Sequence, residues 1–172
     1  MKVGPFDRIR GRAWVLGDNI DTDQIIQGQY LTLLDYEEMA RHTLEIPRPD
    51  FVAGMKKNDV VVAGRNFGAG SSREEAPQVL KTIGVGCVVA ESFSRIFYRN
   101  GFNVGLPLMI VNDVSSSVED GETLTVDFTG GTVTIEQSGK ALQGAPLPPF
   151  MREILEAGGA VERYKKLKGR KG

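Results

Sequence analysis

The chain has 172 residues, of which 41% are hydrophobic and 25% are charged, and its formal net charge is −1. A chain of this length favours one domain over residues 1–172, with a core that buries about 70% of the unfolded surface. The balanced charge excludes the broad basic surface of a nucleic-acid-binding protein, and no apolar stretch has the length of a signal peptide or a membrane span. We therefore expect a cytoplasmic protein that binds neither nucleic acid nor a membrane.

Hydrophobic periodicity predicts alternating strands and helices along the first two thirds of the chain. Short runs rich in valine, isoleucine and leucine are typical of buried strands, and apolar residues at helical spacing lie between them. In chain order, the expected elements are a strand over 11–17, a helix over 33–45 that ends at "IPRPDF", a strand over 60–68, a helix from 72 or 73 to 83, a strand over 87–92, a helix over 94–102 and a strand over 106–113.

The first residues of the helix that ends at 83 predict where it starts. Ser71 or Ser72 can cap it, and two glutamates follow where the helix dipole favours negative charge. Pro77 is tolerated only in the first turn of a helix. The helix should therefore begin near Ser72 or Arg73.

The last third of the chain has a different pattern. "ETLTVDFTGGTVTIEQ", residues 122–137, alternates apolar and polar residues around a glycine turn and predicts a β-hairpin. A final helix is expected over Phe150–Glu156 and Ala160–Leu167, with a break at Gly158 and Gly159. Six of the 21 basic residues lie in the last ten positions, so we expect residues 163–172 to form a basic, flexible tail. This order of elements predicts an α/β domain with a mixed sheet.

Cysteine and histidine each occur once. Cys87 lies in an apolar run and is expected to be a buried core residue; a single cysteine excludes an internal disulfide and any iron–sulfur or cysteine-rich zinc site held by this chain alone. His42 falls in a predicted helix and is expected at its surface or end, without a catalytic role.

"GRNFGAGSSREEA", residues 64–76, has the composition of an anion site. A strand, a glycine turn and a helix start together aim backbone N–H groups at a ligand. Gly68 and Gly70 permit close approach of the backbone, and Arg73 offers a fork for a carboxylate or phosphate. Neither a P-loop nor a dinucleotide fingerprint is present. From the residues alone, a plain turn whose serine caps a helix remains the alternative.

"GDNIDTDQII", residues 17–26, is a second polar cluster directly after a strand. Alternating aspartates can bind calcium, but the glycine and glutamate of an EF-hand loop are missing. An Asx-rich turn that hydrogen-bonds its own backbone is the simpler interpretation. A third is that these carboxylates orient Arg73 or a serine.

Taken together, "DNIDTDQII", "YL", "GRNFGAGSSRE" and "AESFSRIFYRNGFNVGLPL" resemble the small subunits of aconitase-type hydro-lyases, and most closely those of 3-isopropylmalate dehydratases and their homoaconitase relatives. The motifs occur in the family's order over residues 11–149. The resemblance implies a β/β/α three-layer swivelling domain and a separate large subunit with a [4Fe–4S] cluster on its own cysteines. This chain would then hold no cofactor or metal, and the assembly would act on a small dicarboxylate.

The resemblance also implies roles for five residues. Ser71 corresponds to the serine that acts as the catalytic base in its alkoxide form, and Ser72 and Arg73 correspond to contacts with a substrate carboxylate. Asp21 and Thr22 belong to an active-site turn and would bind substrate or orient other groups. A serine can act as a base only where N–H groups and a cation stabilise its anion, and the glycine turn and Arg73 would supply both.

Tyr30, Leu31, Thr32 and Leu33 correspond to the loop that contacts the variable substituent of the substrate. Homoaconitase-like members have an arginine where this chain has Thr32, so a third carboxylate here would lack its cation, at a cost of a few kcal/mol. An isopropyl group could instead pack on Leu31, Leu33 and the methyl group of Thr32, worth about 2 kcal/mol. The resemblance therefore favours interconversion of 2-isopropylmalate and 3-isopropylmalate, in leucine biosynthesis.

Other interpretations stay open. The chain could serve a homoaconitase or a citramalate or dimethylmalate dehydratase, and another arginine, such as Arg48, could reach a third carboxylate. A stand-alone anion-binding module is the non-enzymatic alternative. The sequence does not predict the stoichiometry of the assembly, and an exposed site face would allow the isolated chain to homo-oligomerise.

Overall fold

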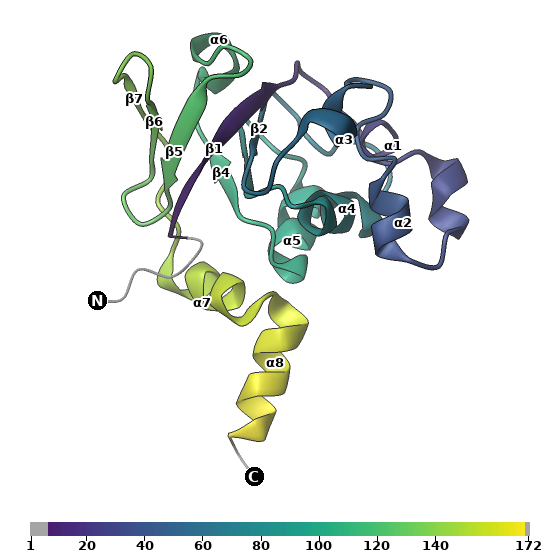
Figure 1. The fold of residues 1–172 in the computed structure, drawn as a ribbon. Helices are drawn as coiled ribbons and strands as arrows, with labels where there is room; N and C mark the ends of the chain where they lie inside the picture. Colours follow the sequence, from purple (N-terminus) through teal and green to yellow (C-terminus); the bar gives the residue numbers. More distant parts are fainter. Residues whose placement is uncertain (1–6, 171–172) are drawn as a thin grey trace.

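The structure of the chain is a computed structural model that describes residues 7–170. At its centre lies a seven-stranded mixed sheet in the order β4-β3-β2-β1-β5-β6-β7 (Figure 1). The strands are β1 (Arg8–Val15), β2 (Val60–Ala63), β3 (Cys87–Ala90), β4 (Leu108–Ile110), β5 (Thr123–Asp127), β6 (Thr132–Ile135) and β7 (Ala141–Gln143). Strands β1 to β4 pair in parallel, and β5 to β7 extend the sheet beyond β1 in antiparallel fashion. The expected α/β class with a mixed sheet is confirmed.

Along the chain, most helices lie between the parallel strands. The helices are α1 (Thr22–Ile25), the 3₁₀ helix η1 (Gly28–Thr32), α2 (Tyr36–Ala40), α3 (Phe51–Gly54), α4 (Glu75–Ile83), α5 (Arg95–Val104), α6 (Val114–Ser117), α7 (Pro149–Ala157) and α8 (Ala160–Gly169). Helix α6 follows β4, and α7 and α8 lie at the C-terminal end. Helices α4 and α5 contact each other beside the parallel strands, and α7 and α8 contact α5 (Figure 1). One excursion of the chain, between β1 and β2, carries α1, η1, α2 and α3.

The sheet curls until its two edges meet. Just beyond β4, Val111 pairs with Gly144, which follows β7, and the Ala145 N–H donates to the Ile110 carbonyl at 3.3 Å. The curl places an apolar core inside the sheet and under the helices, where Cys87 and Phe97 are buried. Burial raises the pKa of the Cys87 thiol far above its usual range, so Cys87 is the inert core residue that the sequence predicts.

Two helices differ from the sequence prediction. Helix α4 begins at Glu75, and neither Ser71 nor Ser72 caps it: the Thr22 hydroxyl instead binds the Ser71 carbonyl that a longer helix would use. Pro77 is the third residue of α4, within the first turn as expected. The helix expected over 33–45 is reduced to Tyr36–Ala40. The Asp35 side chain caps its start, and residues 41–47 form turns, with a φ of +56° at Leu44, whose N–H bonds the Ile25 carbonyl.

The remaining differences lie near the two ends. β1 begins three residues earlier than its apolar run, at Arg8, and the sequence does not predict β7. The break at Gly158 and Gly159 is confirmed, with positive φ at both residues. The expected tail is helical as far as Gly169, and its mobility stays a prediction. Lys171 and Gly172 lie outside the described residues.

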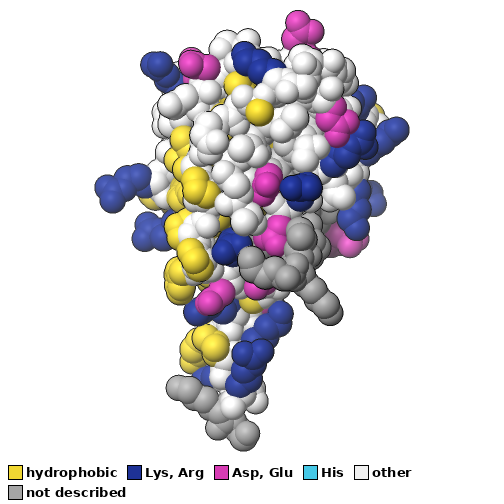
Figure 2. Space-filling model, turned by 90° about the vertical axis from the view of Figure 1, so that its left-hand side faces the viewer, with side chains coloured by type: hydrophobic (Ala, Val, Ile, Leu, Met, Phe, Trp, Pro, Cys, Tyr) yellow, Lys and Arg dark blue, Asp and Glu magenta, His cyan; other side chains and the backbone are white. Residues whose placement is uncertain are grey.

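Helix α8 extends away from the body and carries most of the basic residues of the tail. It has no buried side chain, and lysines and arginines cover much of it (Figure 2). Val161, Tyr164 and Leu167 are its exposed apolar residues. The anion site predicted from the sequence lies elsewhere, where β2 leads into α4.

Candidate active site

The glycine turn that follows β2 is built around positions that exclude side chains. A Cβ atom at Gly64 would overlap the Asp18 carboxylate, and this carboxylate accepts a hydrogen bond from the Arg65 N–H at 2.7 Å. Gly68 has a φ of +81°, and a Cβ there would overlap the buried Phe97 ring. Gly70 has a φ of +93°. The backbone can therefore take this path only with glycine at these positions, because a side chain would overlap its neighbours or need an unfavourable φ.

The two polar motifs of the sequence lie side by side. The Gly68 N–H donates to the Ile20 carbonyl at 2.7 Å, and the Thr22 N–H donates to the Ala69 carbonyl at 2.8 Å. Asp21 and Ala69 form an isolated parallel bridge. These backbone bonds place the aspartate-rich turn directly against the glycine turn, as a joint active site requires.

Ser71 lies at the open end of this pair of turns. Its side chain is exposed, and the Thr22 hydroxyl is 3.5 Å from the Ser71 hydroxyl and donates to the Ser71 carbonyl at 3.0 Å. Within residues 7–170, the N–H groups of Gly70, Ser71 and Ser72 form no hydrogen bond. Several unpaired N–H groups next to a hydroxyl can stabilise negative charge there. Ser72 is also exposed.

Arg73 is held from the aspartate-rich turn. Its Nη1 donates to Asp23 Oδ1 at 2.9 Å and to the Ile26 carbonyl at 3.0 Å. The side chain of Arg73 is only 21% exposed. The hydrogen bond from Arg73 is the main reason that the pKa of the Asp23 carboxyl lies below its usual value. Of the interpretations open for residues 17–26, the structure supports two. The carboxylates of Asp21 and Asp23 accept from nearby backbone N–H groups, as in an Asx-rich turn, and Asp23 also orients Arg73. Asp23 is thus a candidate site residue that motif matching did not single out.

Asp21 has a local task. Its carboxylate accepts from the Gln24 N–H at 2.8 Å, and the Gln24 side chain accepts in turn from the Asp21 N–H at 3.0 Å. This reciprocal pair is a capping box that starts α1. Thr22 is buried, with its hydroxyl turned to Ser71. Asp21 therefore shapes the turn, and Thr22 is the residue of the two that reaches Ser71.

The expected specificity loop forms η1 and its end. Tyr30 stacks on His42 with ring centroids 3.6 Å apart, and His42 Nδ1 lies 2.9 Å from Glu45 Oε1. The hydrogen bond from His42 is the main cause that lowers the pKa of the Glu45 carboxyl. His42 therefore buttresses the loop from the turn after α2, and no contact links it to Ser71.

The side chains of this loop differ in exposure. Leu31 and Leu33 are partly buried against the protein's own core, whereas Thr32 is exposed. The next residue, Leu34, is fully exposed. Of the three side chains expected to contact the substituent, Thr32 is therefore more available to a ligand or a partner than Leu31 and Leu33, and Leu34 is available as well.

Comparisons with known proteins show the family of this chain. Residues 19–113 match the model of the aconitase C-terminal domain. A 3-isopropylmalate dehydratase small subunit from Methanopyrus kandleri is 54% identical over 93% of this chain and 94% of its own. The chain belongs to the aconitase family.

Two relatives from Methanocaldococcus jannaschii extend the comparison. One is named isopropylmalate/citramalate isomerase small subunit and is 48% identical over 92% of this chain and 94% of its own. The other is the crystal structure of a 3-isopropylmalate dehydratase, which is 41% identical and superposes with a TM-score of 0.90 over 96% of this chain and 99% of that one. The fold expected from the resemblance, an aconitase-type domain, is therefore confirmed.

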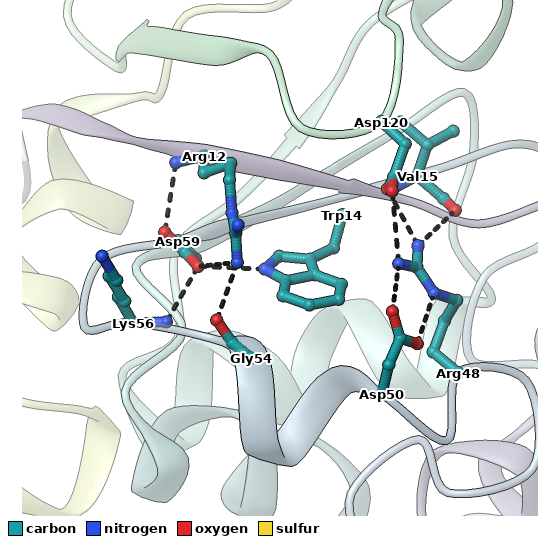
Figure 3. Close-up of polar contacts among 9 residues, drawn as sticks. All are labelled: Arg12, Trp14, Val15, Arg48, Asp50, Gly54, Lys56, Asp59 and Asp120. Carbon is teal, nitrogen blue, oxygen red and sulfur yellow. Dashed lines mark hydrogen bonds and ion pairs between the residues drawn. The ribbon is translucent and has the colours of Figure 1, made fainter.

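Arg48, the other candidate cation for a third carboxylate in this aconitase-family chain, is committed elsewhere. Its guanidinium donates to both oxygens of Asp50 and of Asp120 and lies 4.7 Å from the centre of the Trp14 ring. Figure 3 shows this group beside a second one, in which the buried Asp59 carboxylate accepts from the Trp14 indole N–H at 2.9 Å. Two carboxylates already neutralise Arg48, so it is not a free cation for a substrate.

Metal-binding side chains do not cluster in the described part of the chain. Among residues 7–170, no group of three or more His, Cys, Asp and Glu side chains is placed to hold a metal ion. No helix within the same residues is long and apolar enough to cross a membrane.

Proposed function

We propose that this chain is the small subunit of a 3-isopropylmalate dehydratase, which interconverts 2-isopropylmalate and 3-isopropylmalate by removing and re-adding water. The observation that carries the proposal is the junction of the two turns, where Ser71 lies among unpaired N–H groups, beside Thr22 and close in sequence to a fixed Arg73. The names of the relatives support the same activity, and a cytoplasmic, leucine-biosynthetic role goes with it.

In this mechanism Ser71 moves the proton. As an alkoxide it takes the proton from the carbon next to the one that bears the hydroxyl, a double bond forms, and the hydroxyl leaves as hydroxide, so that the proton and the hydroxide together make up the water removed. Hydroxide then adds to the carbon that lost its proton, and Ser71 returns the proton to the other carbon. The N–H groups of residues 70–72 stabilise the alkoxide, and the Thr22 hydroxyl at 3.5 Å can donate to it.

Ser72 and Arg73 bind a carboxylate of the substrate. Arg73 is suited to this because Asp23 and the Ile26 carbonyl hold only its Nη1, which leaves the Nη2 and Nε edge for two-point contact. Arg73 is mostly buried, so its charge is screened less by salt than that of a surface arginine. Binding at this edge aligns the reacting carbon with Ser71.

A large subunit completes the site. The chain has one cysteine, which is buried, so the [4Fe–4S] cluster of this enzyme class belongs on the partner's cysteines. Bound there, it would supply Lewis-acid chemistry for the departure of the hydroxyl. Ser71 and Ser72 are exposed in the isolated chain, and the large subunit would cover them and exclude bulk water.

The uncharged loop favours an apolar substituent on the substrate. Residues 28–34 contain no charged side chain, and Arg48 is occupied, so a third carboxylate would find no free cation in this loop or at Arg48. Citramalate is the second candidate substrate, because the isomerase relative from Methanocaldococcus jannaschii is named for both activities. A homoaconitase role and a stand-alone anion-binding role are weaker alternatives.

The test is anaerobic reconstitution with the large subunit and a side-by-side assay of 2-isopropylmalate, citramalate and homocitrate. We expect isopropylmalate to have the highest kcat/KM. Ser71→Ala should abolish turnover while the subunits still associate, because only the proton-transfer group is removed. Ser116→Ala is the matched control, since this serine lies on α6 and bonds only the Asp113 carbonyl. Turnover by Ser71→Ala at the wild-type rate would refute the assignment of the base, and preference for homocitrate would refute the substrate.

A further inference from the structure

One carboxylate oxygen joins the two parts of the site that the proposed function treats separately. Asp23 Oδ1 accepts from Arg73 Nη1 at 2.9 Å and from the Gly28 N–H at 3.2 Å. Arg73 is the carboxylate-binding residue, and Gly28 is the first residue of η1, which carries the specificity loop. Both interactions therefore end on a single atom of the aspartate-rich turn.

The packing around this oxygen is close. A Cβ atom at Gly28 would lie 3.4 Å from Arg73 Nη2 and 3.8 Å from Asp23 Oδ1, so the start of the loop lies against the guanidinium. The Gln27 side chain does not cap η1, and the Asp23 carboxylate accepts from the Gly28 N–H in its place. A displacement of Arg73 would therefore also displace the first turn of η1.

The Asp23 side chain itself is 59% exposed and makes no contact with Ser71. The Asp23 carboxylate accepts from Arg73 Nη1 and from the Gly28 N–H. It therefore leaves Nη2 and Nε of Arg73 for a substrate carboxylate. Asp23 is suited to holding other groups rather than to touching the reacting atoms.

We propose that Asp23 is a positioning residue that couples the carboxylate-binding arginine to the specificity loop, so that fixing Arg73 also fixes where the loop meets the variable substituent. This inference rests on the proposed function for its kinetic consequences. Its structural part, one carboxylate holding both Arg73 and Gly28, can be tested without turnover.

The experiment compares Asp23→Ala and Asp23→Asn with the wild-type chain. In Asp23→Ala both interactions are lost, so amide exchange at Gly28 should rise about fivefold, the effect of losing one capping acceptor, and the Arg73 Nε–H signal should shift in NMR spectra. Asp23→Asn keeps an oxygen that can accept from Gly28 but loses the charge. Its Gly28 exchange should stay within about twofold of wild type while the Arg73 signal still shifts.

Kinetics of the reconstituted enzyme test the coupling. Asp23→Ala should raise KM about fivefold for citramalate and about fifteenfold for isopropylmalate with little change in kcat, because both substrates lose the carboxylate contact and isopropylmalate also loses a well-placed loop. The preference for isopropylmalate, the ratio of the two kcat/KM values, should therefore fall about threefold. Asp23→Asn should raise both KM values and keep the preference.

Asp127→Ala is the matched control, because Asp127 also accepts from backbone N–H groups and lies 3.6 Å from an arginine, but in the β5–β6 hairpin. It should change none of these values. Unchanged Gly28 exchange in Asp23→Ala, an unchanged preference, or the same changes in Asp127→Ala would each overturn the inference. If the wild-type enzyme processes neither substrate, the proposed function fails, and the exchange and NMR signals alone decide whether Asp23 holds Arg73 and Gly28.

Discussion

Replacing Gly68 by alanine tests whether backbone geometry holds the glycine turn in place. Gly68 has a φ of +81°, which costs a residue with a Cβ about 1–2 kcal/mol. The new Cβ would also lie 2.6 Å from Phe97 Cδ2 and closer still to Phe97 Cβ and Cγ. Phe97 is only 2% exposed and cannot move away freely, so overpacking adds about 1–3 kcal/mol. The sum predicts a loss of about 2–5 kcal/mol in the free energy of unfolding.

Two other glycines separate these contributions. Gly121 has a φ of +89°, and nothing lies within 4 Å of the place that a Cβ would take, so Gly121→Ala should lose only the backbone part, about 1–2 kcal/mol. Gly17 has open space and no positive φ, so Gly17→Ala should be close to neutral or slightly stabilising. The three variants should therefore rank in stability as Gly17→Ala, Gly121→Ala, Gly68→Ala.

The assay is urea denaturation of the isolated chain, followed by turnover of the reconstituted enzyme. Gly68→Ala should also lose activity, because the turn that presents Ser71 must shift to relieve the overlap. A Gly68→Ala chain no less stable than Gly121→Ala would refute the reasoning, since it would mean that the Phe97 contact imposes no cost.

Three further predictions follow from other contacts. Asp59→Ala removes the acceptor of the Trp14 indole N–H and of two backbone N–H groups, so unfolding should become about 3–5 kcal/mol easier, with a shift in the fluorescence of the single tryptophan; unchanged stability would contradict the network of Figure 3. Arg73→Lys should raise KM for isopropylmalate about tenfold or more with a smaller effect on kcat, because lysine cannot make two-point contact; an effect on kcat alone would argue against a binding role. Hydrogen bonds from arginine or histidine lower the pKa values of the Asp23, Glu45 and Asp120 carboxyls. The stability that these ionised carboxylates contribute is therefore present above about pH 4 and is lost as the pH falls through the lowered pKa values. The melting temperature should fall between pH 7 and pH 3, and a melting temperature that rises over this range would contradict the argument.

Much of the fold could be predicted from local patterns. Strands β2, β3 and β4, the hairpin of β5 and β6, helix α5 and the break at Gly158 and Gly159 all depend on side-chain periodicity or on glycine conformations that neighbours in sequence specify. β7 could not be predicted, because two of its three residues are exposed and the strand has no apolar pattern; its pairing with β6 makes it a strand. The start of α4 was predicted wrongly because a residue 49 positions away, Thr22, binds the Ser71 carbonyl.

By itself the sequence determined the residue types of the site: glycines where the backbone needs positive φ, a serine and an arginine after them, an uncharged loop and a single buried cysteine. It also carried the motifs that mark the aconitase family. Only the tertiary structure decided which groups meet. It set Thr22 against Ser71, placed Arg73 and Gly28 on one oxygen of Asp23, turned Leu31 and Leu33 toward the core, and tied Arg48 to two other carboxylates. The reason is physical: local backbone preferences act over a few residues, whereas contacts such as Thr22 with Ser71 and Asp23 with Arg73 join segments about 50 residues apart, one after β1 and one after β2, which pair in parallel.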